Sequence, residues 1–176
     1  MITSPVPLLF GLDESHEANE WRFNCGPGAL CGVLSMTPAQ LRPHMLDFEQ
    51  KGYTNPTLMF DVLKGLKVEH KLIFRTDDPQ QEIRWPSFGL CRVQWHGPWM
   101  RAGVPMKARY RKTHWIGASG DDASQRLIFD INAIEWGGWL PFQTWDTQLV
   151  PWLLNEVQPD ASGSWHITHS IEIPRP

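Results

Sequence analysis

Three residues that are far apart in the sequence have the side chains of a nucleophilic triad: Cys25, His114 and Asp130. A cysteine attacks as its thiolate, and a histidine held by a carboxylate generates and orients that thiolate. Cys25 stands in the stretch NCGPGAL, where apolar residues begin to recur at helical spacing. The dipole and unpaired N–H groups of a helix N-terminus lower the pKa of a thiol. We therefore expect Cys25 at the start of a helix, as a candidate nucleophile.

The context of Cys25 alone fits a buried structural cysteine equally well, because free cysteine is among the most buried residue types. Gly26 and Gly28 favour the reactive alternative, since glycines leave room for a substrate carbonyl to approach the backbone. Gly26 is accordingly a candidate substrate contact. Cys31 and Cys91 are expected to be buried in the helix and in a strand.

His114 and Asp130 provide the second feature that a reactive cysteine needs. His114 opens one predicted strand and Asp130 closes the next, with GASGDDASQRL as the hairpin connection. The hairpin brings both side chains to the same end of adjacent strands. Asn132 is a neutral alternative partner for His114, and a slip of one residue in register would turn the other face inward. The hairpin geometry favours Asp130.

The stretch NCGPGAL, followed by HWIGASGDDASQRLIFDINA, resembles the papain-like cysteine peptidases. Within them it is similar to the peptidase domains that process double-glycine leader peptides and to their stand-alone relatives. The resemblance covers residues 19–134 and implies Cys25 as nucleophile, His114 as base and Asp130 as its orienting partner. It places the glutamine of the oxyanion hole at position 19, which is Asn19 here. The resemblance therefore implies Asn19, with the Cys25 N–H, as oxyanion donors.

The resemblance implies a thiol-dependent hydrolase that cleaves a peptide or isopeptide bond through an acyl-enzyme, without cofactor or metal. Its expected partner is a peptide or protein substrate. Two alternatives stay open. An acyltransferase or cross-linking enzyme would use the same triad with an amine as acceptor. A catalytically inactive papain-like binding module is favoured by Asn19 at the place of the glutamine.

The elements that must position the triad form a helical part, about residues 20–67, and a sheet part, about residues 68–176, of one domain. Thr37 and Gln40 form a capping box around Pro38, and Thr54 or Asn55 caps a further helix. Short runs rich in branched and aromatic residues predict strands: VEHKLIF, SFGLCRVQW, THWIGAS, RLIFDIN and WHITHSIEI. A last helix breaks near Pro151. We expect an α+β, papain-like domain of two packed layers with an antiparallel sheet.

Composition excludes several classes of protein. A net charge of −3 and a pI near 6.1 argue against a general nucleic-acid binder. No run of residues is long and apolar enough for a membrane span, and the start of the chain lacks the pattern of a signal peptide. Three cysteines are too few for a disulfide framework and indicate reduced thiols. We expect a cytoplasmic protein.

Aromatic and basic residues suggest the walls of a substrate cleft. Trp95 and Trp99 in WHGPWM and Trp136 in IEWGGW stand among Gly and Pro in loops, and we expect one of these three tryptophans at the groove. Trp115, directly after His114, and Trp136 are the candidate substrate contacts. Five basic residues between positions 101 and 112 precede His114 and form a candidate rim for an acidic substrate. His166 and His169 are three residues apart, which on a regular strand places them on opposite faces and argues against a metal site.

Overall fold

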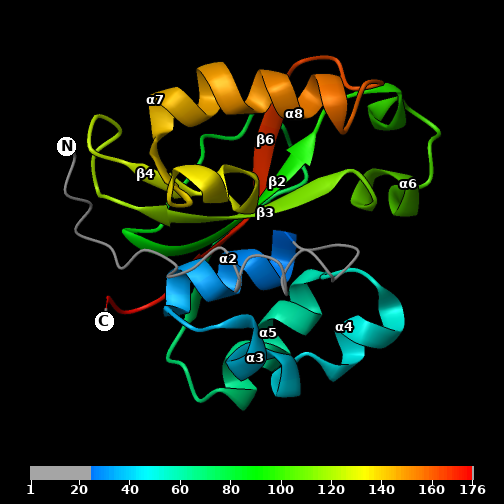
Figure 1. The fold of residues 1–176 in the computed structure, drawn as a ribbon. Coiled ribbons are helices and arrows are strands. Elements are labelled where there is room, and N and C mark those ends of the chain that lie inside the picture. Colours follow the sequence, from blue (N-terminus) through cyan, green and yellow to red (C-terminus); the bar gives the residue numbers. More distant parts are fainter. Residues whose placement is uncertain (1–24, 176) are drawn as a thin grey trace.

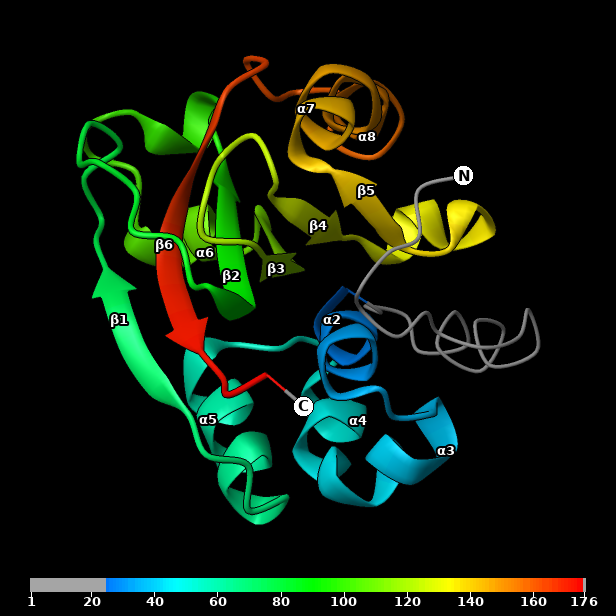
Figure 2. The ribbon, with the colours of Figure 1, turned by 90° about the vertical axis from the view of Figure 1, so that its left-hand side faces the viewer.

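The computed structural model describes residues 25–175, and its centre is a six-stranded antiparallel sheet in the order β1-β6-β2-β3-β4-β5. The strands are β1 (Lys71–Arg75), β2 (Phe88–Trp95), β3 (Thr113–Ser119), β4 (Leu127–Phe129), β5 (Trp139–Pro141) and β6 (Trp165–Glu172). Figure 2 shows the twisted sheet with β1 and β5 at its two edges. The α+β class predicted from the sequence is confirmed.

Helices cover both faces of this sheet, so the domain has three layers and the expectation of two was wrong (Figure 1). One face packs against α2 (Cys25–Leu34), α3 (Pro38–Leu41), η1 (Arg42–His44), α4 (Leu46–Lys51) and α5 (Pro56–Gly65). The other packs against α7 (Phe142–Thr144), the π-helical turn η4 (Trp145–Leu149) and α8 (Val150–Glu156). Shorter connections contain η2 (Pro98–Met100), α6 (Met106–Tyr110) and η3 (Ile131–Trp136).

The predicted helix caps are present. Thr37 accepts a hydrogen bond from the N–H of Gln40, whose side chain accepts from the N–H of Thr37, so the capping box is complete. Asn55, rather than Thr54, caps α5 by accepting from Leu58 at 2.8 Å. These caps satisfy N–H groups that a helix leaves unpaired, and they fix where each helix begins.

Glycines let α2 approach the sheet closely. A Cβ atom at Gly32 would lie 2.5 Å from the Phe129 ring, and one at Gly28 would lie 2.9 Å from the Ile131 side chain. Gly117 on β3 leaves corresponding space for Val33. Backbone and side chain thus interlock where α2 crosses β3 and β4, which holds the start of α2 at a fixed height above the sheet.

On the opposite face, the last helix changes geometry before Pro151. The N–H of Val150 bonds to the carbonyl of Trp145, a π-type turn, and α8 follows. Proline lacks an N–H and cannot continue regular α-helical bonding, which explains the break that the sequence predicted. Trp145, Leu149 and Val150 are buried against the sheet.

A bulge in β6 corrects the expectation for its histidines. Arg92 pairs with His169 and Gln94 pairs with His166, with the register shifting between them. Thr168 is therefore an extra residue, and His166 and His169 share one face of the sheet instead of lying on opposite faces. Within residues 25–175, no group of three or more His, Cys, Asp or Glu side chains is arranged to hold a metal ion.

Across the same described residues, none of the helices combines the length and apolar character that spanning a bilayer requires.

Substituting Gly32 tests the close packing of α2. Gly32→Ala forces a methyl group into the Phe129 ring, so we expect a loss of about 1–3 kcal/mol in the free energy of unfolding, measured by urea denaturation. Gly65→Ala is the matched control, because its nearest neighbour, His44, is 3.9 Å away and alanine favours a helix. Equal effects of the two substitutions would contradict the interlocking described here.

Candidate active site

Cys25 is the first residue of α2 and is partly exposed, whereas Cys31 and Cys91 are buried. The first N–H groups of an α-helix have no partner within the helix, so they and the dipole favour a negative charge at this end. Cys25 therefore combines access with an electropositive backbone environment. Burial gives Cys91 the opposite character by raising the pKa of its thiol to about 12.

His114, the second residue of β3, lies between Cys25 and Asp130. Its Nε2 is 2.9 Å from Asp130 Oδ2, and its imidazole lies close enough to Cys25 for the two groups to shift each other's pKa. Since Nε2 is used by Asp130, Nδ1 is the nitrogen available to the thiol. The chain thus connects sulfur, imidazole and carboxylate in the order that activates a cysteine nucleophile.

The Asp130 side chain is fully buried and accepts four hydrogen bonds. Oδ2 accepts from His114 and from Trp145 Nε1, the latter at 2.8 Å. Oδ1 accepts from the backbone N–H and from the side-chain amide of Asn132, at 3.0 and 2.8 Å. Of the two residues proposed from sequence to orient His114, Asp130 makes the contact, and Asn132 holds Asp130.

Charge distribution favours an ion pair between Cys25 and His114. Burial opposes the charge on each group, but the hydrogen bond and charge of His114 leave the pKa of Cys25 below its usual value. Asp130 and Cys25 raise the pKa of His114 above its usual range. The pKa of Asp130 stays low because His114, Trp145 and Asn132 outweigh the effect of burial. At neutral pH these directions favour thiolate, imidazolium and carboxylate.

Trp95 covers one face of the imidazole. Its ring lies 5.8 Å from that of His114 at an interplanar angle of 25°. The Trp95 side chain is itself buried, and its backbone carbonyl accepts from Trp99 Nε1 at 2.7 Å. The stacked ring restricts rotation of His114 and keeps water from this face of the site.

Cys25 lies at the wall of a cleft with a volume of about 1090 Å³, formed by the described residues. One wall is the segment 51–57, which runs from the last residue of α4 into the first turn of α5, and the other carries residues of β1, β2, α6 and β6. Trp115 lines the cleft, and its Nε1 donates to the Thr54 carbonyl at 2.8 Å, which ties the helical wall to β3. The volume is enough for several residues of an extended peptide, since small-molecule pockets are typically about 300–1,000 Å³.

The other predicted substrate contacts are placed differently. Gly26 is buried, and a Cβ atom there would lie 2.2 Å from Thr54 Oγ1, so the glycine makes room for Thr54 rather than for a substrate carbonyl. Trp136 is exposed and is not among the described residues that line the cleft. Asn19, the predicted oxyanion donor, lies outside the described residues.

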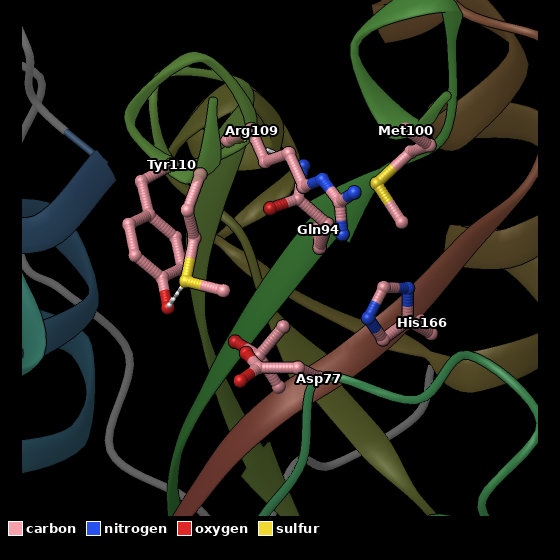
Figure 3. Close-up of a pocket in the computed structure, with 8 residues that line it drawn as sticks. Asp77, Gln94, Met100, Arg109, Tyr110 and His166 are labelled. Carbon is pink, nitrogen blue, oxygen red and sulfur yellow. Dashed lines mark hydrogen bonds between the residues drawn. The ribbon is translucent and has the colours of Figure 1, made fainter. Parts of the chain in front are cut away.

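A much smaller cavity of about 10 Å³ lies beside the cleft, between α6 and the strands β2 and β6 (Figure 3). It has room for about one water molecule. Gln94 Nε2, at its wall, donates to the carbonyls of Arg109 and Lys112 at 3.0 and 2.9 Å. These bonds anchor α6 and its flanks to β2, so this region fixes a wall of the cleft instead of taking a substrate. His166, on the other side, contacts His96 Nε2 at 2.7 Å.

Comparison with known proteins adds no relative: no protein-family model, curated protein or solved structure matches this chain.

Two residues at the site were missed by the sequence reasoning. Trp145 reaches Asp130 from the opposite face of the sheet, and nothing in its local sequence distinguishes it from the other tryptophans. Arg92 lines the cleft although it belongs to a wholly buried strand, FGLCRVQW, in which it is the one charged residue. A charged residue inside such a strand is a usable signal, because arginine is rarely buried without a partner or a function.

Alkylation by iodoacetamide tests the ion pair. Because the pKa of Cys25 is lowered and that of His114 raised, we expect Cys25 to react well below the pKa of about 8.5 of a free thiol. His114→Ala should abolish this advantage. Peptide mass spectrometry reads the rate at each pH, with Cys31 and Cys91 as internal controls. A Cys25 rate that follows an ordinary thiol, or that does not change in His114→Ala, would show that the pair is absent.

Trp145→Phe tests the support of Asp130. It removes an N–H donor to a buried carboxylate, for which we expect a loss of about 1.5–3 kcal/mol in the free energy of unfolding and slower alkylation of Cys25 at neutral pH. Trp139→Phe is the matched control, because Trp139 is also buried but its Nε1 has no hydrogen-bond partner among the described residues. Urea denaturation and alkylation kinetics give both quantities. Indistinguishable variants would assign Trp145 a packing role only.

Proposed function

We propose that this protein is a thiol-dependent hydrolase of papain-like architecture that cleaves a peptide or isopeptide bond through an acyl-enzyme. The observation that carries the proposal is the pair of His114 with the buried Asp130 beside Cys25, which stands at a helix start and at the wall of a large cleft. A buried structural cysteine would need neither the lowered pKa nor the supported histidine.

In the first half of the reaction, the Cys25 thiolate attacks the substrate carbonyl carbon and the carbonyl oxygen becomes an oxyanion. His114, as imidazolium, then protonates the leaving amine while the carbon–nitrogen bond breaks. The acyl group remains on sulfur as a thioester. Asp130 keeps Nδ1 of His114 directed toward the reacting atoms throughout.

In the second half, neutral His114 removes a proton from water, which attacks the thioester carbonyl. The carbon–sulfur bond breaks, the acid leaves, and the thiolate and imidazolium are restored. The N–H groups at the start of α2 are the described donors suited to the oxyanion, and Asn19 is proposed as a further donor. Amine capture of the same thioester would give acyl transfer.

An activated ester tests this function without knowledge of the natural substrate. With p-nitrophenyl acetate we expect a burst of nitrophenol and one acetyl group on Cys25, followed by hydrolysis, with the burst lost in Cys25→Ala. His114→Ala should slow both steps, and intact-protein mass spectrometry follows the acyl-enzyme. Products formed with an added amine separate acyl transfer from hydrolysis. Acetylation at other residues, with turnover unchanged in Cys25→Ala, would exclude the proposed nucleophile.

A further inference from the structure

The cleft beside Cys25 is strongly basic, although the whole chain carries a net charge of −3. Five cationic side chains line it, and no Asp or Glu is among its described lining residues: Lys51, Arg75, Arg92, Lys107 and Arg111. Lys51 is neutralised by Asp47 at 2.7 Å. The other four form no ion pair within the described part of the chain. Charges of one sign in a concave site concentrate ligands of the opposite sign.

Arg92 differs from the other three cations because it is buried, so water does not compensate its charge. Its side chain is only 3% exposed, yet it lines the cleft. Nη2 donates to two neutral oxygens, the Tyr110 carbonyl at 3.4 Å and Thr113 Oγ1 at 3.3 Å. Nε has no hydrogen-bond partner in residues 25–175. A buried guanidinium without a carboxylate is costly, so its retention points to an external anion.

The position of Arg92 relates it to the nucleophile. Arg92 on β2 pairs directly with Trp115 on β3, the residue after His114, and both line the same cleft as Cys25. Burial lowers the pKa of Arg92 to about 10, so the guanidinium stays charged at neutral pH. The Tyr110 ring lies 5.0 Å from it and covers one face. The guanidinium is thereby oriented beside the place where a substrate would be cleaved.

We propose that the cleft selects peptides with a carboxylate next to the scissile bond and that Arg92 is the specificity-determining residue that binds it. This inference rests on the proposed hydrolase function. Arginine is suited to the role because its planar N–H groups match a carboxylate in paired hydrogen bonds. Arg75, Lys107 and Arg111, which are exposed at the cleft, attract the acidic ligand from solution.

Two alkylating reagents of the same shape test the charge selectivity. Iodoacetate carries a carboxylate and iodoacetamide does not, so the ratio of their rates at Cys25 reports the local preference for an anion. The thiolate fraction affects both rates equally and cancels in the ratio. We expect Arg92→Gln to lower the ratio about tenfold, the size expected for one charge-assisted hydrogen bond. The charge-matched control Arg101→Gln, exposed and outside the cleft lining, should leave it unchanged.

A second variant keeps the test decisive if Arg92→Gln does not fold. Arg75 and Arg111 are exposed, so their joint replacement by glutamine preserves the core, and we expect a decrease of about threefold that added salt reduces. Ratios that stay at the parent value in every folded cleft variant would overturn the inference. If iodoacetamide still reacts rapidly and depends on His114, the hydrolase proposal survives that result. Slow, His114-independent alkylation would instead reject the hydrolase proposal itself.

Protection by short peptides identifies the source of the carboxylate. N-acetylated peptides that differ only in Asp or Asn, each with a free or an amidated C-terminus, compete with iodoacetamide for Cys25. Stronger protection by the amidated Asp peptide than by its Asn counterpart supports a side-chain carboxylate. Protection that requires a free C-terminus supports a terminal carboxylate. Equal protection by all four peptides in the parent protein would overturn carboxylate selection.

Discussion

The buried carboxylate of Asp130 is the constraint on which the rest of the site depends. A charge in the interior is stable only when hydrogen bonds replace the lost water, and Asp130 receives them from His114, Trp145 and Asn132. These donors come from three separate parts of the chain, so the carboxylate is satisfied only when the sheet, η3 and η4 are all in place. The fold and the protonation state of His114 are therefore coupled.

The second requirement is that the start of α2 meets the start of β3. The helix can approach the sheet closely because Gly28 and Gly32 on α2 have no side chains. The space is occupied by the side chains of Ile131 and Phe129. Phe129 immediately precedes Asp130, so the same short segment packs under the helix and supplies the carboxylate. Because protein interiors are close-packed, these contacts leave α2 little freedom to move relative to β3 and β4. The nucleophile and its base are thus aligned by core packing, and Cys25 needs no flexible loop to reach His114.

Local sequence patterns predicted the parts of the site that local physics determines. The helix beginning at Cys25 follows from apolar periodicity, and the hairpin brings His114 and Asp130 to the same end of adjacent strands. The observed register pairs Gly117 with Phe129 and so places Asp130 opposite Ile116, which means that Asp130 reaches His114 diagonally and not as its direct neighbour. Features that depend on distant segments could not be predicted in this way. The bulge at Thr168 changes which face two histidines share, and the third layer exists because Trp145 and α8 fold back across the sheet. Gly26 indicated a close approach at the start of the helix, but the sequence did not show that the Thr54 side chain is the group that approaches.

Arg92 and His114 are both electrostatically coupled to the Cys25 sulfur, and this links the reactivity of the thiol to the choice of ligand. Each cation favours the thiolate of Cys25, and the thiolate in turn stabilises each cation. In a site of low dielectric such interactions are stronger than in water and little screened by salt. A carboxylate bound at Arg92 would weaken that cation's effect on the thiolate, leaving His114 as the main support of the charge. Division of the two tasks between separate cations lets the cleft hold an acidic ligand without losing its nucleophile.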